Sequence, residues 1–189
     1  NNHTIFCSGS LKDNFVFLET VNFQGEYPLK DSKAQTIKNG LYANLSYLGP
    51  TQSSINVNTT NNILYKIKVI GTQYKALNNP IEIPFLSGLT VNTDGNYITS
   101  DLTDTPFNLW YSTNSNLVNG FSSGATQIAS QTVVGTGQEI KFTGINQNIG
   151  SNCYLYITVD LSATATNNNT IKVKNIPFSA FSFSNSNFE

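Results

Sequence analysis

Few residues in this chain could carry out chemistry, and they lie far apart in the sequence. The one histidine is His3, near the first residue, and the two cysteines are Cys7 and Cys153. A nucleophilic triad needs a base that a third group orients, and a zinc site needs several ligands at close spacing. The sequence offers neither pattern, and it offers no carboxylate pair with the signature of a glycosidase. We therefore expect no catalytic residues, no cofactor and no enzyme activity.

The densest group of possible metal ligands lies between residues 94 and 104. It consists of Asp94, Asn96, Asp101 and Asp104. Hard oxygen ligands on a turn could hold Ca²⁺. The spacing is not that of an EF-hand, however, and Asp and Asn are also ordinary turn formers. The pattern favours turn chemistry, and Asp94, Asp101 and Asp104 remain weak candidates for metal ligands.

The two cysteines allow two interpretations. Cys7 and Cys153 are either two free, buried thiols or the halves of a disulfide that ties the N-terminal segment to a late strand. Such a bond would close a long loop and strongly constrain the unfolded chain. Exported proteins permit bonds of this kind. Both interpretations stay open at the level of sequence.

The composition excludes some partners and disfavours helices. Charged residues make up 11% of the chain and the net charge is −1, so it has no electrostatic footprint for nucleic acid or an anionic membrane. No apolar run approaches the roughly 20 residues that a membrane span needs. Asparagine accounts for 27 of the 189 residues, and it suits turns better than helix interiors. Methionine is absent even at position 1, so we expect a processed chain or an excerpt.

The hydrophobic pattern has a period of two almost throughout. Within residues 153–161 the odd positions are apolar, while Tyr154, Tyr156 and Asp160 face the other way, which is typical of a strand with one face in a core and one in water. Similar alternation runs through residues 63–69, 107–111, 171–174 and 181–184. Turn signals rich in Asn and Gly separate these runs. The sequence therefore predicts an all-β fold, an antiparallel two-sheet sandwich of Ig-like or jelly-roll-like type, with the 153–161 strand central in one sheet.

The chain divides near residue 45. We expect residues 1–44 to be an N-terminal extension with one strong strand, 15–23, and residues 45–189 to be the sandwich. The apolar face of the strand carries Phe15, Phe17, Val21 and Phe23 and is interrupted only by Glu19. A strand this apolar must pair with a sheet edge, either of its own sandwich or of a neighbour's. Pairing with a neighbour would link subunits in series, so we expect the extension to mediate assembly, with self-pairing as the alternative.

Three aromatic residues are predicted to form a contact surface. Trp110, Tyr154 and Tyr156 lie on the non-core side of their strands by alternation. If these strands are neighbours, the rings form one exposed patch, and such patches mark contact surfaces. The patch could meet a glycan or a neighbouring protein. Alternatively it forms a second core layer, which we expect to be covered only if residues 1–44 pack there.

An ordered series of motifs resembles a known module. The motifs are TTNNILY (59–65), LSGLTV (86–91), TDGNYITSDL (93–102), FNLWYS (107–112), IKFTGI (140–145), YITVDLSATA (156–165) and TIKV (170–173). This order resembles an Ig-like β-sandwich module of large secreted and surface proteins in Bacteroidota. It is similar to the module that precedes the catalytic domain of some BNR-repeat sialidases, and to modules of giant surface adhesins, including those linked to gliding. The resemblance covers about residues 47–187.

The resemblance implies a function without catalysis. It points to the cell surface or the extracellular space, and to a structural or adhesive subunit that assembles into a filament or a multi-module adhesin. The partners would be further copies of the chain, neighbouring modules or glycans. The alternative is a carbohydrate-binding or spacer module attached to a secreted hydrolase such as a sialidase. No catalytic residues are known to us in the module, so none are transferred.

Overall fold

The computed structural model describes residues 3–5, 35–37, 43–49, 54–71, 84–132 and 137–184. The chain divides into two compact units, Asn1–Gly40 and Leu41–Glu189. In the first unit, β1 (His3–Ile5) pairs antiparallel with β2 (Gln35–Ile37). The division falls close to the boundary expected near residue 45. The sandwich unit includes β3, which starts at Ala43 and therefore within the expected extension.

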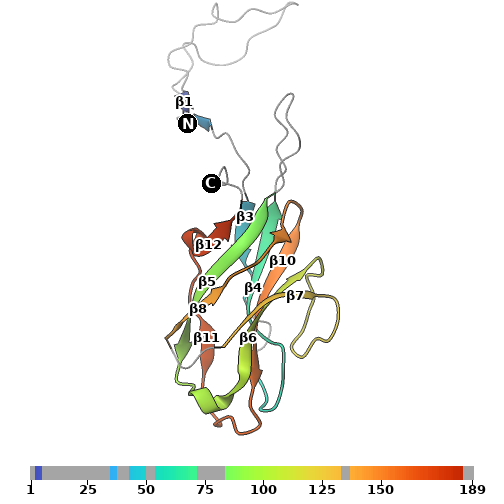
Figure 1. The fold of residues 1–189 in the computed structure, drawn as a ribbon, viewed down its shortest axis with the longest axis vertical. Helices are drawn as coiled ribbons and strands as arrows, with labels where there is room; N and C mark the ends of the chain where they lie inside the picture. The colour runs from blue at the N-terminus through green and yellow to red at the C-terminus, as the bar shows by residue number, and fades with distance from the viewer. Residues whose placement is uncertain are drawn as a thin grey trace, which may run out of the picture. The chain divides into compact units, whose positions relative to one another are not determined.

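The second unit is an all-β sandwich of two antiparallel sheets, as the sequence predicts (Figure 1). The first sheet has the order β3 (Ala43–Tyr47), β4 (Asn62–Gly71), β10 (Cys153–Leu161), β6 (Leu102–Ser112) and β7 (Thr126–Gln131). The β10 strand thus lies at the centre of this sheet, which confirms its predicted position. The predicted runs 63–69 and 107–111 lie in β4 and β6.

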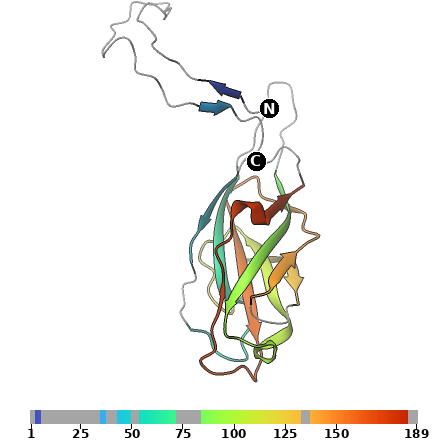
Figure 2. The same cartoon turned by 90° about the vertical axis from the view of Figure 1, so that its left-hand side faces the viewer.

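The second sheet is built around one long strand, β5 (Phe85–Gly95). Four short strands pair with it: β8 (Glu139–Phe142), β9 (Gln147–Asn148), β11 (Ile171–Val173) and β12 (Phe181–Phe183). The predicted alternating segments near residues 171 and 181 are β11 and β12. Figure 2 shows the two sheets from the side, as two facing layers. Two short 3-10 helices, η2 (Thr99–Asp101) and η3 (Phe178–Ala180), lie in the connections.

The main core fills the space between the sheets. Leu155, Ile157 and Val159 of β10 meet Leu86 and Leu89 of β5 there, and all five are at most 1% exposed. The three β10 residues occupy every second position, because alternate side chains of a strand point to the same face. On β5, Leu86 and Leu89 are three positions apart, where the pairing with β12 has a register shift. The period-two pattern in the sequence therefore identified the β10 side of this core correctly.

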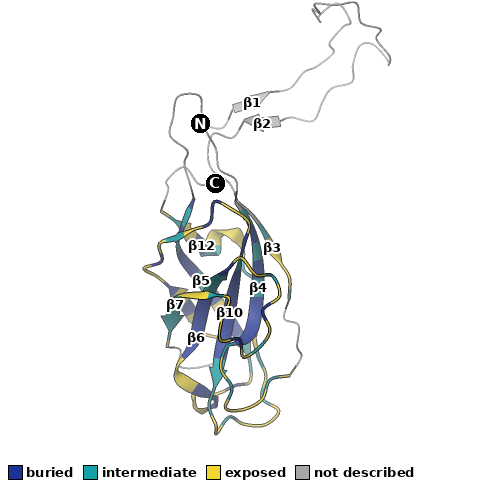
Figure 3. Cartoon of the chain, turned by 90° about the vertical axis from the view of Figure 1, so that its right-hand side faces the viewer, coloured by how far each residue is buried: buried dark blue, intermediate teal, exposed yellow. Residues whose placement is uncertain are grey.

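The outer face of β10 departs from the prediction. The sequence predicts water on this face, but Tyr156 and Thr158 are both fully buried. Figure 3 shows β10 as buried over most of its length. A further layer must therefore cover the outer face of the first sheet, and that layer organises the candidate site.

Candidate functional site

A second apolar cluster lies on the outer face of the first sheet, and we call it the outer-face cluster. It consists of buried Ile63, Leu117, Phe121 and Tyr156, with partly buried Trp110, Ala125 and Tyr154. The strands β6 and β10 are neighbours, and Trp110 stands directly opposite Tyr156 in their register. The three aromatic residues named from the sequence therefore lie on one face of neighbouring strands. The prediction that all three are exposed is wrong for Tyr156, which is 0% exposed.

Residues 113–125, here named the covering loop, bury this cluster. Phe121 packs against Trp110 with ring centroids 5.1 Å apart and planes at 80°, and it lies 6.3 Å from the ring of Tyr156. Edge-to-face contacts of this kind add to the energy of simple burial. From the sequence we expect coverage only if residues 1–44 pack there. Within the described residues, the connection that follows β6 covers the cluster.

Polar contacts fix the covering loop to the sheet. The Tyr156 hydroxyl donates to the Asn114 carbonyl at 2.6 Å, and the Ile63 N–H donates to Oδ1 of Asn119 at 2.8 Å. Nδ2 of Asn61 donates to the Phe121 carbonyl at 2.9 Å. Nζ of Lys66 donates to the Ser115 carbonyl. Burial raises the pKa of Tyr156 because a phenolate would lose its solvation there.

Lys66 also lies over the aromatic rings. Its Nζ is 5.3 Å from the ring centroid of Tyr154 and 5.8 Å from that of Tyr156. A cation at this distance is attracted by the electron-rich ring faces. The rings of Tyr154 and Trp110 keep partial exposure. What remains at the surface is therefore a pair of partly covered rings beside a fixed loop, which can act as a contact surface.

A polar row borders the cluster on β6 and β10. Nε1 of Trp110 donates to Oγ1 of Thr158 at 3.0 Å. Asp160 accepts from the Asn61 N–H at 2.6 Å and from Nδ2 of Asn108 at 3.1 Å. Burial raises the pKa of Asp160, and these two donors oppose that rise. The carboxylate is therefore used to position the turn that precedes β4.

Of the three weak metal candidates, Asp101 and Asp94 are engaged in other contacts, whereas Asp104 is an exposed residue of β6. Asp101 is 2% exposed, and its Oδ1 accepts from the Thr166 N–H at 2.6 Å. Its Oδ2 accepts from the Ile98 N–H at 2.9 Å and from Nδ2 of Asn169 at 2.7 Å. Asp94 instead forms an ion pair with Lys172 at 3.2 Å. Within the described ranges, no three His, Cys, Asp or Glu side chains lie close enough to hold a metal ion.

Cys153 lies in the main core. Its side chain is 0% exposed, and no disulfide joins it to another described residue. Burial raises the pKa of the thiol to about 12, which removes the reactive thiolate at ordinary pH. Cys7 lies outside the described residues, so its pairing with Cys153 remains a prediction. Phe15, Phe17, Val21 and Phe23 also lie outside them.

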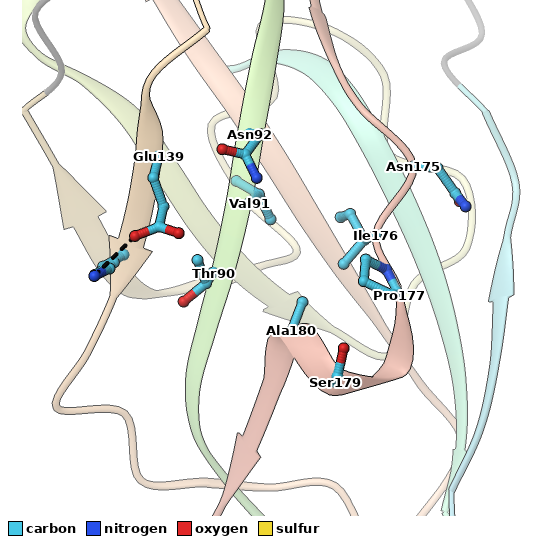
Figure 4. A pocket seen from close by; sticks show the side chains of 10 residues that line it. Thr90, Val91, Asn92, Glu139, Asn175, Ile176, Pro177, Ser179 and Ala180 are labelled. Atoms are coloured by element: carbon cyan, nitrogen blue, oxygen red, sulfur yellow. Dashed lines mark ion pairs between the residues drawn. The ribbon is translucent and has the colours of Figure 1, made fainter.

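An open hollow of about 350 Å³ lies beside β5 (Figure 4). It forms because the chain leaves β5 after Lys174, whose N–H donates to the Asn92 carbonyl at 2.8 Å, and pairs with β5 again from Phe181 to Leu89. Residues 90–92 and the Glu139–Lys141 ion pair of 2.8 Å line the hollow, together with part of segment 175–180. No aromatic ring lines it, so it lacks a stacking surface for a sugar.

Comparisons of the chain with family models, curated proteins and solved structures found no match. The resemblance to the Bacteroidota module therefore stays a prediction. Among the described residues, no helix is long and apolar enough to cross a membrane. The fold and the contacts above define an all-β sandwich with a covered outer face.

Proposed function

We propose that the chain is a non-catalytic structural or adhesive subunit of a cell surface or of a secreted assembly. The observation that supports this proposal is that polar side chains of the sandwich hold its own loops and turns in place. Asp101 and Asp160 accept from backbone N–H groups, and Lys66 holds the covering loop. Each of these groups stabilises a loop or turn on the sandwich, which suits a module whose task is to present rigid surfaces.

The proposal includes assembly through the N-terminal extension. An alternating apolar segment such as 15–23 can add to the edge of a sheet in a neighbouring copy. A head-to-tail contact that does not close on itself produces a filament. The low charge and the abundance of Asn are in keeping with a location at the cell surface or outside the cell.

Size measurements and activity assays test this function together. Sedimentation velocity of the full chain over a wide concentration range should show species larger than the monomer. Assays against common glycans and peptides should show no turnover. A chain that stays monomeric at every concentration would remove the assembly part of the proposal, and turnover of any of these substrates would remove the non-catalytic part.

Partial exposure of Trp110 and Tyr154 supports a second candidate, a carbohydrate-binding module. Aromatic rings at a protein surface offer a face for the C–H groups of a sugar. A glycan array should then show saturable binding to one class of sugar by a monomer. The Trp110→Ala variant should lose that binding if the rings form the site, whereas binding that survives the change would place the site elsewhere.

A further inference from the structure

The two edges of the first sheet are the longest edges of the described sandwich. In the second sheet, the strands beside β5 contain two to four residues each: β8, β9, β11 and β12. The first sheet ends in β3 with five residues and in β7 with six. Since an added strand needs a continuous row of backbone groups, β3 and β7 are the edges to compare.

The backbone of β3 is suited to accept another strand. Leu48 N–H donates to the Lys66 carbonyl of β4 at 3.0 Å. Because N–H and C=O groups alternate sides along an antiparallel strand, Ser46 also faces β4, whereas Leu45 and Tyr47 direct theirs away from it. No described strand pairs with β3 on that outer side.

Two adjacent apolar side chains at this edge, Tyr47 and Leu48, are exposed. Leu45 packs against the main core, and Tyr47 stacks on Tyr65 with ring centroids 4.1 Å apart. Tyr65 is a buried residue of the main core, so the stacked rings connect this edge to the core. Tyr47 is nevertheless 54% exposed and the adjacent Leu48 is 47% exposed. The edge strand β7 carries no large apolar side chain that is exposed to this degree.

We propose that β3 is the acceptor edge for segment 15–23 of a second copy of this chain. This inference rests on the proposed function as an assembling subunit and names the surface that the assembly uses. An added strand would place one side-chain face over Tyr47 and against the main core. The alternating face of Phe15, Phe17, Val21 and Phe23 supplies apolar groups at that spacing.

Within the described part of the chain, no strand covers this edge, and Tyr47 and Leu48 remain about half exposed. Adjacent exposed apolar side chains on a strand edge favour edge-to-edge association unless they are covered. A second copy carries a segment of matching pattern, and pairing would satisfy the outward N–H and C=O groups of Leu45 and Tyr47.

A matched pair of variants at one position tests the acceptor edge. Tyr47→Ala and Tyr47→Pro both remove the ring, but only proline also removes the outward N–H. We expect the protein concentration at which the larger species form to be about tenfold higher for Tyr47→Pro than for Tyr47→Ala, because the proline variant lacks one edge hydrogen bond. Fluorescence of the single tryptophan, Trp110, checks that both variants keep the fold.

A second pair tests the donated segment. Phe17→Asp places a charge on the apolar face, whereas Thr20→Asp places the same charge on the opposite face. We expect Phe17→Asp to abolish the larger species and Thr20→Asp to retain them. If the wild-type chain assembles and all four variants assemble equally well, β3 is not the acceptor and the inference is wrong, while the proposed function stands.

A mixing experiment separates donation from self-pairing. The Phe17→Asp chain keeps an intact acceptor edge, and the Tyr47→Pro chain keeps an intact segment. Mixed together at a concentration at which neither variant assembles alone, they should form a 1:1 dimer, because the mixture offers one intact acceptor edge and one intact segment. Absence of that dimer would overturn the inference. A wild-type chain that is monomeric throughout would overturn both the inference and the assembly part of the proposed function.

Discussion

Asp101 connects two segments of the sandwich that are far apart in the sequence. Its carboxylate holds the N-terminus of its own short helix through Ile98 and holds the later turn through Thr166 and Asn169. Burial alone would raise its pKa, but the hydrogen bonds outweigh that effect and lower the pKa to about 2 from an ordinary value of 3.8. The folded state therefore depends on the charged form of this residue.

The Asp101→Asn variant should be less stable by about 2 kcal/mol at neutral pH, because an amide cannot accept from the same set of N–H donors. The pH dependence should change as well. A lowered pKa in the folded state gives stability that is complete above about pH 4 and is lost as the pH falls towards 2. Urea unfolding at pH 7 and pH 3 should show a smaller difference for the variant. Equal pH dependence of both proteins would contradict the assigned role of Asp101.

The Cys153 thiol should be inert in the folded protein. Full burial and a pKa of about 12 should slow its reaction with a disulfide reagent at pH 8 by on the order of a hundredfold relative to the unfolded chain. Thiol titration with and without urea measures this. A count of free thiols in the unfolded, unreduced chain also decides between the two interpretations of Cys7 and Cys153, since a disulfide would leave none.

At the scale of elements, the covering loop packs on the outer face of β10, where the sequence predicts solvent. The Phe121→Ala variant should lose about 2–3 kcal/mol of stability, because Phe121 is 8% exposed and fills the space between Trp110 and Tyr156. Trp110 fluorescence should shift to longer wavelength as water reaches the indole. Val118→Ala is the matched control, since Val118 is on the same loop but 62% exposed, and it should change stability by less than about 0.5 kcal/mol.

Several strands could be predicted from their alternation, but β5 and the covering loop could not, since the apolar residues Leu86 and Leu89 of β5 break the period of two. Alternation identifies β4, β6 and β10 because side chains of one strand face a core at every second position. The covering loop has no such period, and its contribution rests on two large apolar residues, Leu117 and Phe121, in a segment rich in Ser and Asn. These two apolar residues are the feature of the sequence that could have indicated a buried loop. The hydrogen bonds of Asp101 join residues more than 60 positions apart, and no local pattern reveals such a contact.

At the scale of the whole molecule, the sandwich should fold without the first part of the chain. Residues Leu41–Glu189 form a compact unit of their own. Deletion of residues 1–24 should therefore leave a folded, soluble monomer, while the full chain forms larger species. Sedimentation velocity and circular dichroism measure the two properties. Unfolding on deletion of a chain that was always monomeric would mean that the segment belongs to its own core.

The place of β10 between β4 and β6 has a consequence for how the polypeptide is made. Both neighbours precede it in the chain, so a growing polypeptide presents two separate hairpins, β3–β4 and β6–β7, until residue 161 has emerged. Strand pairing over such sequence separations is slow. The first sheet therefore cannot close until β10 has been synthesised, and β4 and β6 wait for their shared neighbour until then.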